Sequence, residues 1–377
     1  MTVTSRLPQR WARQARAALP LALLFASPAA AQLHADDPTV HEYTLRNATG
    51  MTVRFLDLGA TITAVEVPDR RGKSANVVLG YGSTGEYRTK NTKNGFGAAI
   101  GRYAGRIANA RFPLDGQTYR LRPNLGPHAL HGGVGPGFDQ RVWQVRRFRE
   151  GKVDAAALTF VSPDGDQGFP GTLTVTITYR LLHDNALRID YTARTTKPTV
   201  LNLTNHSYFN LAGGGSIATQ RLRIAATRWV ETDEVGIPTG RLAPVAGTPL
   251  DFRTDHTIGE RIDHEGPPMS GPGGYNHAWI VAPAMRATPR PTLWMCDPAS
   301  GRTLTVETTE PSVQLYTGDY IDGRDVDALG RPIRPRDGIA IETQGFADAP
   351  NHPKFPSTRL DPGKTFRSTT IYRFGAN

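Results

Sequence analysis

Residues 173–192, LTVTITYRLLHDNALRIDYT, determine the expected fold class. Two runs rich in Leu, Val, Ile, Thr and Tyr flank the polar sequence HDN at residues 183–185, which is typical of a turn. This pattern predicts two strands, Leu173–Leu181 and Leu187–Thr192. The same texture continues in both directions and predicts further strands at Thr52–Leu56, Leu222–Ala225, Leu304–Glu307, Val313–Tyr316 and Gly338–Thr343.

The spacing of these runs predicts an all-β protein. No long segment with a 3.6-residue apolar period separates them, so alternating βαβ units are not expected. No linker, low-complexity tract or internal repeat divides the chain past residue 40. We therefore expect one large antiparallel β-sandwich domain over residues 38–377.

The composition is that of an ordinary globular protein, with 38% hydrophobic and 21% charged residues among 377. A chain of this length can bury a sizeable core without disulfides or a structural metal. Its one cysteine, Cys296, cannot form an internal disulfide. The composition therefore excludes disulfide-rich, fibrous and disordered classes.

The first 31 residues differ from the rest and predict a signal peptide. Four arginines and no acidic residue precede a short apolar stretch at residues 17–26, and Ala29–Ala31 supply small side chains for cleavage before Gln32. No second long apolar run follows, so we expect no membrane attachment after cleavage. The mature protein is expected to be periplasmic or secreted.

The charge balance does not point to nucleic acid. The formal net charge is +10, but removal of residues 1–31 leaves 40 of the 44 basic residues against 34 acidic ones, or +6. The remaining arginines are scattered and form no basic stripe interleaved with aromatic residues. A solvated basic surface is expected. The sequence leaves the oligomeric state open.

Several expected strands have one apolar and one polar or aromatic face. Gln314 shares a face with Tyr316, and Glu342 shares one with Gln344. Taken singly, each such face is better explained by contact with water. Together they suit the floor of a sugar cleft, because sugars offer hydroxyls at their rim and C–H groups on their faces. In an extended segment 201–211, one face would carry Asn202, Thr204, His206, Tyr208 and Asn210.

Seven blocks of the sequence resemble the aldose 1-epimerase (galactose mutarotase) family. The signature-like block is LTNHSYFNL at residues 203–211. The resemblance covers residues 40–375 and implies a β-sandwich of the galactose mutarotase type. The other blocks follow in the family's order: GRYAGRI at 101–107, LHGG at 130–133, GTPLDFR at 247–253, VQLYTG at 313–318, IETQ at 341–344, and NHP, PST and DPG between 351 and 363.

The resemblance implies interconversion of the α and β anomers of a free aldose such as glucose or galactose. A base takes the proton of the anomeric hydroxyl, an acid protonates the ring oxygen, and the opened sugar recloses on its other face. Neither a metal nor a redox cofactor is required. The resemblance makes Glu342 the base and His206 the acid. Both residue types fit, because burial raises a carboxyl pKa and histidine titrates near neutrality.

The resemblance also implies four sugar-binding residues. His131 corresponds to a second histidine near the ring oxygen, Arg106 to an arginine that holds hydroxyls, and Gln314 to a glutamine beside the sugar. Asn276 stands where the family has an aspartate, so we expect a weaker hydrogen bond there and an altered sugar preference. Gly105 replaces the family's asparagine before the arginine.

Other functions remain open from the residues alone. A glycosidase or lyase would pair Glu342 with a second carboxylate about 5–10 Å away, such as Asp251 or Asp319. A carbohydrate-binding protein would use the cleft without catalysis. Epimerisation of a sugar phosphate lacks an obvious phosphate site. No metal site is expected, because the spacing of four loop residues fits no metal motif: His256, Asp263, His264 and Glu265.

Overall fold

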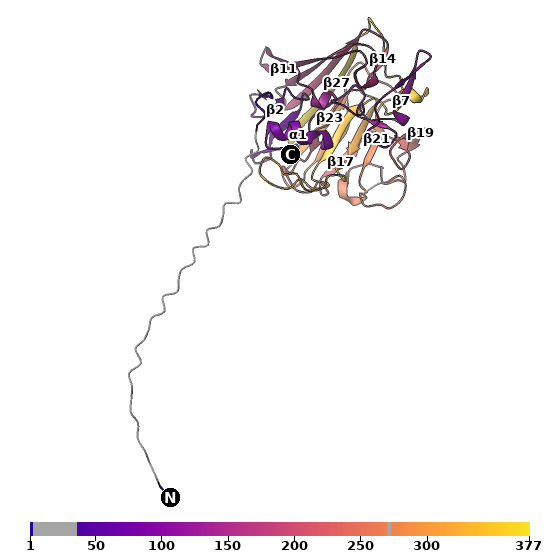
Figure 1. Cartoon of the computed structure of the whole chain (residues 1–377). Coiled ribbons are helices and arrows are strands. Elements are labelled where there is room, and N and C mark those ends of the chain that lie inside the picture. The colour runs from indigo at the N-terminus through magenta and orange to yellow at the C-terminus, as the bar shows by residue number, and fades with distance from the viewer. Residues whose placement is uncertain (3–35, 270–272) are drawn as a thin grey trace. The chain divides into compact units, whose positions relative to one another are not determined.

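The computed structural model describes Met1, Thr2 and residues 36–269 and 273–377 (Figure 1). It divides into two units, Met1–Leu33 and His34–Asn377. The expected signal peptide lies outside the described residues apart from Met1 and Thr2, and stays a prediction. In the part that is described, no helix is both long and apolar enough to cross a bilayer.

The larger sheet of the second unit has nine strands, and every neighbouring pair is antiparallel. The expected strand Leu173–Leu181 is present with those bounds, and Leu187–Thr192 lies inside its longer partner. In order across the sheet the strands are β10 (Gln144–Glu150), β11 (Val153–Ser162), β12 (Leu173–Leu181), β13 (Ala186–Thr195), β27 (Phe366–Ala376), β23 (Arg302–Thr308), β22 (Arg290–Cys296), β17 (Arg221–Ile224) and β20 (His256–Thr257).

The second sheet has six antiparallel strands and carries several of the expected site residues. Two of its strands were expected from the sequence, at Val313–Tyr316 and Gly338–Thr343, and both are confirmed within one residue at each end. In order they are β16 (Tyr208–Phe209), β25 (Ile339–Gln344), β24 (Ser312–Tyr316), β21 (Asn276–Ile280), β18 (Arg228–Thr232) and β19 (Pro238–Pro244).

Smaller sheets complete the unit. The expected strand Thr52–Leu56 is β2 of a four-stranded antiparallel sheet. Its other members are β1 (Glu42–Arg46), β3 (Ile62–Pro68) and β4 (Ser74–Asn76). Four two-stranded pairs are β5 (Ala99–Ile100) with β15 (Thr204–Asn205), β6 (Arg106–Ile107) with β9 (Ala129–Leu130), β7 (Arg111–Leu114) with β8 (Gln117–Arg120), and β14 (Thr199–Val200) with β26 (Arg359–Leu360).

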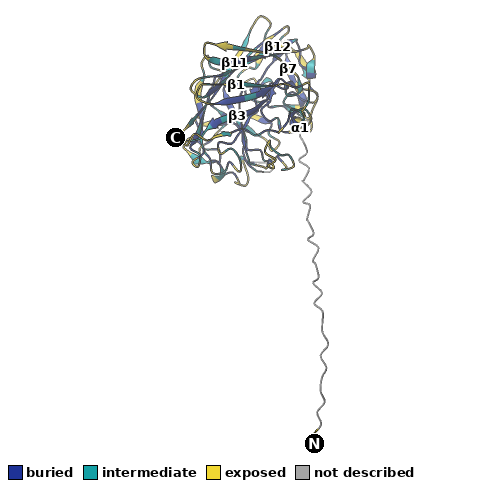
Figure 2. Cartoon of the chain, turned by 90° about the vertical axis from the view of Figure 1, so that its left-hand side faces the viewer, coloured by how far each residue is buried: buried dark blue, intermediate teal, exposed yellow. Residues whose placement is uncertain are grey.

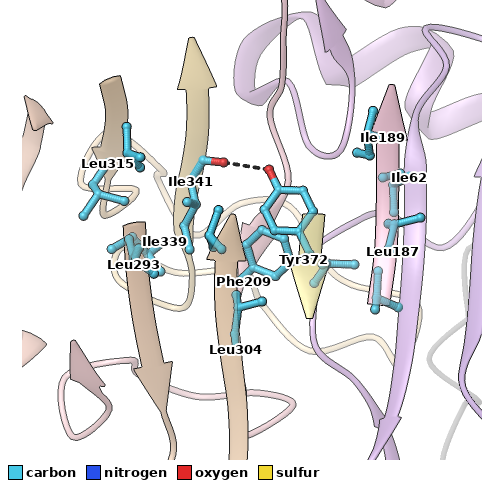
Figure 3. Packing of buried hydrophobic residues seen from close by; sticks show 14 of the residues in the cluster. Ile62, Leu187, Ile189, Phe209, Leu293, Leu304, Leu315, Ile339, Ile341 and Tyr372 are labelled. Carbon is cyan, nitrogen blue, oxygen red and sulfur yellow. Dashed lines mark hydrogen bonds between the residues drawn. The ribbon is translucent and has the colours of Figure 1, made fainter. Parts of the chain in front are cut away.

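The two large sheets bury one hydrophobic core between them. Ile339, Ile341 and Leu315 from the six-stranded sheet share a cluster with Leu304 and Tyr372 from the nine-stranded sheet (Figure 3). The hydroxyl of Tyr372 donates to the carbonyl of Ile341 at 3.0 Å, which satisfies its polar end inside the core. Figure 2 shows this burial in dark blue along the strands, with exposed residues mainly in loops. The expected all-β sandwich is confirmed.

One helix, α1 (Thr84–Asn94), was not expected. Its sequence, TGEYRTKNTKN, is polar throughout and has no apolar stripe for a periodicity argument to find. The usable signals were its caps, because Ser83 accepts a hydrogen bond from the N–H of Glu86 and Gly95 ends the helix with φ 64°. Short 3-10 turns lie at η1 (Ala108–Ala110), η2 (Phe138–Gln140), η3 (Asp166–Gly168), η4 (Ile258–Glu260) and η5 (Ala349–Asn351).

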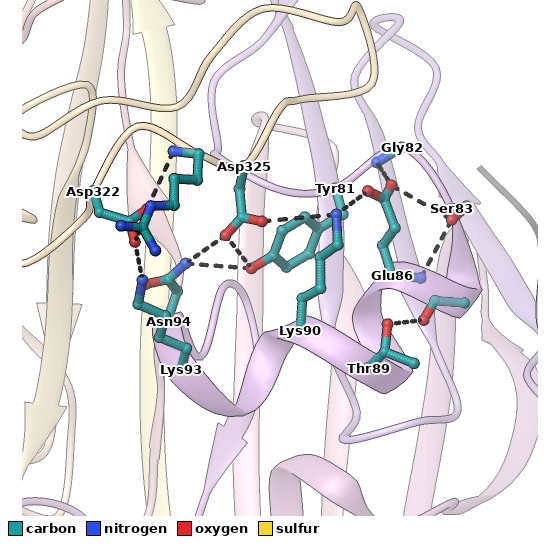
Figure 4. A network of polar contacts seen from close by, with 12 residues as sticks. Tyr81, Gly82, Ser83, Glu86, Thr89, Lys90, Lys93, Asn94, Asp322 and Asp325 are labelled. Carbon is teal, nitrogen blue, oxygen red and sulfur yellow. Dashed lines mark hydrogen bonds and ion pairs between the residues drawn. The ribbon is translucent and has the colours of Figure 1, made fainter. Parts of the chain in front are cut away.

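Polar contacts fix this helix in place (Figure 4). Lys90 and Asn94 both reach Asp325, and Lys93 pairs with Asp322 at 2.6 Å. The last carbonyl of the helix, at Asn94, accepts a hydrogen bond from the hydroxyl of Tyr208 at 3.0 Å. The helix therefore supports the aromatic ring that lies beside His206.

The segment 201–211 differs from its expected form. The two faces require one continuous extended segment, but the segment divides into β15 and β16, which pair with different partners. All eleven residues are buried. Asn202 and Asn210 donate to backbone carbonyls, so they do not line a cleft floor. The alternation rule fails because strand pairing is interrupted at residues 206–207 and continues with another partner.

Candidate active site

The base expected from the sequence lies in the middle of a sheet. Glu342 is on β25, and Gln314 on β24 is its direct cross-strand partner. Side chains at paired positions point to the same face. The opposite face of β25 enters the core through Ile339 and Ile341, as the alternation predicted. Glu342 is only 3% exposed.

His206 follows β15 and is fixed by its backbone. Its N–H donates to the carbonyl of Ala98 at 2.9 Å, and its carbonyl accepts from the N–H of Gly97 at 3.1 Å. The ring packs 5.1 Å from that of Tyr208, between centroids. Its Nε2 lies 3.5 Å from Oε1 of Glu342. The two residues expected to be acid and base therefore point to the same place.

His131 is positioned by the segment that precedes Arg106. It takes a left-handed conformation, with φ 52°, directly after β9. Its N–H donates to the carbonyl of Gly105 at 3.0 Å, and the N–H of Gly105 donates back to Nδ1 of the ring at 3.2 Å. Since Nδ1 is an acceptor, the neutral ring carries its proton on Nε2. That N–H is a fixed donor.

Arg106 begins β6, which pairs with β9 and so places Arg106 opposite Leu130. A Cβ atom on Gly236 would lie 2.9 Å from Cζ of Arg106, so the guanidinium packs directly against this glycine. Among the described residues its buried Nε has no hydrogen-bond partner. Burial lowers the pKa of Arg106, and the charge of Glu342 offsets part of that effect. An incompletely paired buried cation of this kind suits a polar ligand.

The three central side chains form one compact group. Ligand atoms of His131, His206 and Glu342 lie within 4.8 Å of one another, the one such group of three among residues 36–269 and 273–377. The two histidine rings meet edge to face at 5.4 Å between centroids. A tetrahedral zinc ion would need donor atoms about 3.4 Å apart. Nε2 of His206 and Oε1 of Glu342 lie 3.5 Å apart, close to this value, so the group is compact enough to hold a metal ion or to exchange protons with a bound molecule.

The electrostatics of this group favour acid–base chemistry. Burial raises the pKa of Glu342, while the charges of His206 and Arg106 oppose the rise. Burial also lowers the pKa of His131 well below its usual value, and the charges of His206 and Arg106 lower it further. Glu342 is thus a stronger base than an exposed carboxylate, and His131 stays a neutral donor.

Asn276 lies one strand beyond Gln314. Its Oδ1 accepts a hydrogen bond from Nε2 of Gln314 at 2.8 Å. Asn276 pairs with Tyr316 across β21 and β24, and both side chains are partly exposed. The structure therefore brings Asn276 and Gln314 into contact, and the Nδ2 group of Asn276 has no hydrogen bond within the described residues.

All six residues expected at the site belong to this region, and one neighbour was missed. The carboxyl group of Asp139, in η2, interacts electrostatically with His206. Burial raises the pKa of Asp139, and the charge of His206 offsets part of that rise. Asp139 lies in a glycine-rich loop without periodicity, so no pattern in the sequence marks it.

Most of the residues considered for a glycosidase or for a loop metal site form ion pairs. Asp251 pairs with Arg253 at 2.7 Å, and Asp319 pairs with Arg336 at 2.7 Å. Arg336 also holds Asp263. The loop histidine His256 pairs with Glu260 at 3.1 Å, while His264 and Glu265 are exposed. These ion pairs give Asp251, Asp319 and His256 structural partners.

A large cavity lies away from the site. It has a volume of about 1160 Å³ and lies against β1–β4, with Asp69, Lys73 and Arg302 in its lining. None of the six expected site residues lines it. Size alone therefore does not locate the chemistry in this protein.

Comparison with known proteins agrees with the geometry. A family model described as aldose 1-epimerase matches residues 41–373. The chain is 39% identical over 339 residues to a galactose mutarotase from Sus scrofa, covering 89% of this chain and 94% of the relative. It is 38% identical over 337 residues to an aldose 1-epimerase from Escherichia coli K12, covering 88% and 94%.

Solved structures give the same result. An aldose epimerase homologue from C. elegans superposes with a TM-score of 0.81 at 29% identity, covering 89% of this chain and 99% of that one. A galactose 1-epimerase from Lactobacillus acidophilus superposes with a TM-score of 0.78 at 28% identity, covering 90% and 95%. The match spans nearly the whole described unit in sequence and in fold, and the chain therefore belongs to the aldose 1-epimerase family.

Proposed function

We propose that this protein is an aldose 1-epimerase that interconverts the α and β anomers of free sugars such as glucose or galactose. The observation that carries the proposal is the pairing of Glu342 Oε1 and His206 Nε2 at 3.5 Å. The anomeric hydroxyl oxygen and the ring oxygen of an aldose are both bonded to C1. A base and an acid on neighbouring side chains can therefore serve both oxygens at once.

The reaction needs only groups that the chain supplies. The carboxylate of Glu342 takes the proton of the anomeric hydroxyl while protonated His206 gives its Nε2 proton to the ring oxygen, and the C1–O5 bond breaks. The aldehyde turns about C1–C2. His206 then takes back the O5 proton as O5 attacks C1, and Glu342 returns its proton to O1. Each positioned group of this kind typically contributes about 10²–10⁴-fold.

Two further groups hold the sugar during this exchange. The Nε2–H of His131 is a neutral donor beside the His206 ring. The Arg106 guanidinium can hold two hydroxyls with its planar fork. Both contacts orient the sugar and place it between acid and base.

Polarimetry tests the function directly. Freshly dissolved α-D-glucose, α-D-galactose, xylose and arabinose are followed with and without the purified protein. Equilibration of at least one sugar should be faster with catalytic amounts of protein. Unchanged equilibration of all four, with sugar binding seen by calorimetry, would instead show a carbohydrate-binding protein.

Asn276→Asp is expected to change KM or sugar preference more than kcat. The new carboxylate keeps the acceptor for Gln314 and exchanges a neutral N–H donor for a charged acceptor. A charge-assisted hydrogen bond is stronger by about 1 kcal/mol, so KM for the favoured sugar should change by about fivefold. Steady-state kinetics on all four sugars measures this. A large change in kcat at constant KM would contradict the binding role.

We propose that the protein is exported and acts in the periplasm or outside the cell. The support is the order of basic, apolar and small residues in positions 1–31. Mass spectrometry of the exported protein should find Gln32 at the N-terminus. Recovery of the intact chain from the cytoplasm alone would contradict this proposal.

A further inference from the structure

One buried asparagine joins the three chain segments that carry His206, Arg106 and Glu342. Asn202 lies four residues before His206 and is 2% exposed. Its Nδ2 donates to the carbonyl of Ala104 at 2.9 Å and to the carbonyl of Gly345 at 3.1 Å. Its Oδ1 accepts from the N–H of Gly345 at 2.8 Å. All the hydrogen-bonding capacity of its Nδ2 is used on backbone groups.

These partners lie next to the functional residues. Ala104 is two residues before Arg106, and Gly345 is three residues after Glu342. No backbone hydrogen bond links Ala104 to Gly345 in the part of the chain that is described. The carboxamide of Asn202 makes this connection instead, because it bonds to the backbone of both segments.

The backbone of Asn202 strengthens the bridge. Its carbonyl accepts from the N–H of Ala104 at 2.8 Å, and its N–H donates to the carbonyl of Arg102 at 3.0 Å. The main chain and the side chain of Asn202 thus both bind residues 102–104, directly before Arg106. A rotation of the amide would break bonds on two segments at once.

The same two segments meet again further along. The hydroxyl of Tyr103 donates to the carbonyl of Phe346 at 3.1 Å and accepts from the N–H of Ala349 at 3.2 Å. Asp348 donates its N–H to the carbonyl of Arg106 at 2.8 Å and accepts from the N–H of Ala108 at 2.9 Å. Of these contacts, the one between Asn202 and Gly345 lies nearest to Glu342 along the chain.

We propose that Asn202 is a positioning residue for mutarotation, one that sets the separation of Glu342 and Arg106 through its carboxamide. It rests on the proposed function, and it assigns Asn202 no contact with the sugar. Catalytic groups must hold their productive geometry within about 0.5 Å. A displacement of about 1 Å can cost about 100-fold in rate.

The test compares two substitutions of the same kind in one segment. Asn202→Asp keeps the size and the Oδ1 acceptor for Gly345 but turns a carboxylate oxygen towards two carbonyls. Asn210→Asp is the matched control. Asn210 is 1% exposed, and its Nδ2 also donates to two backbone carbonyls, those of Gly215 at 2.6 Å and Asp337 at 2.7 Å. It has no hydrogen bond to the segment of Arg106, and it reaches the chain of Glu342 only at Asp337, two residues before β25, so it does not bridge the two.

Both variants should lose stability, but only one should lose activity. At a temperature where both are folded, Asn202→Asp should lower kcat at least about 10-fold and raise KM, while Asn210→Asp keeps kcat within about twofold. Lower pH should raise the kcat of Asn202→Asp relative to that of the wild type, because a protonated aspartate regains an O–H donor. Urea unfolding of each variant measures the stability.

Two results would overturn the proposal. One is wild-type kcat and KM for folded Asn202→Asp, and the other is an equal loss of kcat in Asn210→Asp. If Asn202→Asp does not fold, Asn202→Ser replaces it, because the shorter hydroxyl side chain cannot bridge the carbonyls of Ala104 and Gly345; wild-type kinetics for it would then overturn the proposal. An inactive wild-type protein would instead refute the proposed function.

Discussion

Glu342→Gln is expected to lower kcat for mutarotation at least about 100-fold. The amide keeps the size of the side chain and its place opposite Gln314, but it cannot accept the proton of the anomeric hydroxyl. KM should change much less, because hydrogen bonding to the sugar remains possible. Initial rates by polarimetry over a range of sugar concentrations separate the two constants.

His206→Asn should cause a loss of similar size, since it removes the proton donor to the ring oxygen. The double variant should be little slower than the poorer single variant, because groups that act in one step are not additive. Near wild-type mutarotation by folded Glu342→Gln would show that the base lies elsewhere.

The pH dependence gives an independent check of the base. Glu342 must be ionised to act, and its burial raises its pKa above the ordinary value of 4.5. As pH falls through this raised pKa the carboxylate is lost, so kcat should fall at a higher pH than an exposed glutamate would allow. In Glu342→Gln the residual rate should not show this acidic limb.

The sequence predicted the fold well wherever strands were long and uniform. Leu173–Leu181 was placed without error, because a run of β-branched and apolar residues between turns has few other structures. The helix α1 was missed because its polar sequence lacks an apolar stripe. Its caps at Ser83 and Gly95 were readable but are weak evidence without such a stripe.

The site residues could be predicted from the resemblance of the sequence to a known family, but not from the apolar periodicity of its strands. Alternation correctly placed Gln314 and Glu342 on polar faces of regular strands. It failed for Asn202, because segment 201–211 changes partners between β15 and β16. The bridging role of Asn202 depends on Ala104 and Gly345, which are distant in sequence. No local pattern carries that information.

Glu310→Gln is expected to stabilise the protein by about 3 kcal/mol at pH 8. Glu310 lies between β23 and β24, is 2% exposed, and its Oε1 has no hydrogen-bond partner among the described residues. Burial raises its pKa from 4.5 to about 7, and the nearby Ser368 acts in the opposite direction. Each pKa unit corresponds to about 1.4 kcal/mol, so ionising Glu310 in the folded protein is costly.

The sign of this effect fixes its pH window. The folded pKa is above the unfolded one, so the stability linked to Glu310 is complete below about pH 4.5 and is lost as pH rises through about 7. Urea unfolding of the wild type and Glu310→Gln should therefore give similar free energies near pH 4.5 and a widening gap up to pH 8. The raised pKa values of Glu342, Asp139 and Asp348 are common to both proteins and cancel in the difference.

A glutamate in the adjoining strand provides the control for this prediction. Glu307 on β23 is partly exposed and pairs with Arg373 at 3.0 Å, so Glu307→Gln removes an ion pair and relieves no buried charge. It should not raise the free energy of unfolding at pH 8. A gap between wild type and Glu310→Gln that stays constant from pH 4.5 to 8 would mean that Glu310 titrates normally. In that case the carboxylate of Glu310 would be solvated or paired in solution, which would contradict its burial between β23 and β24.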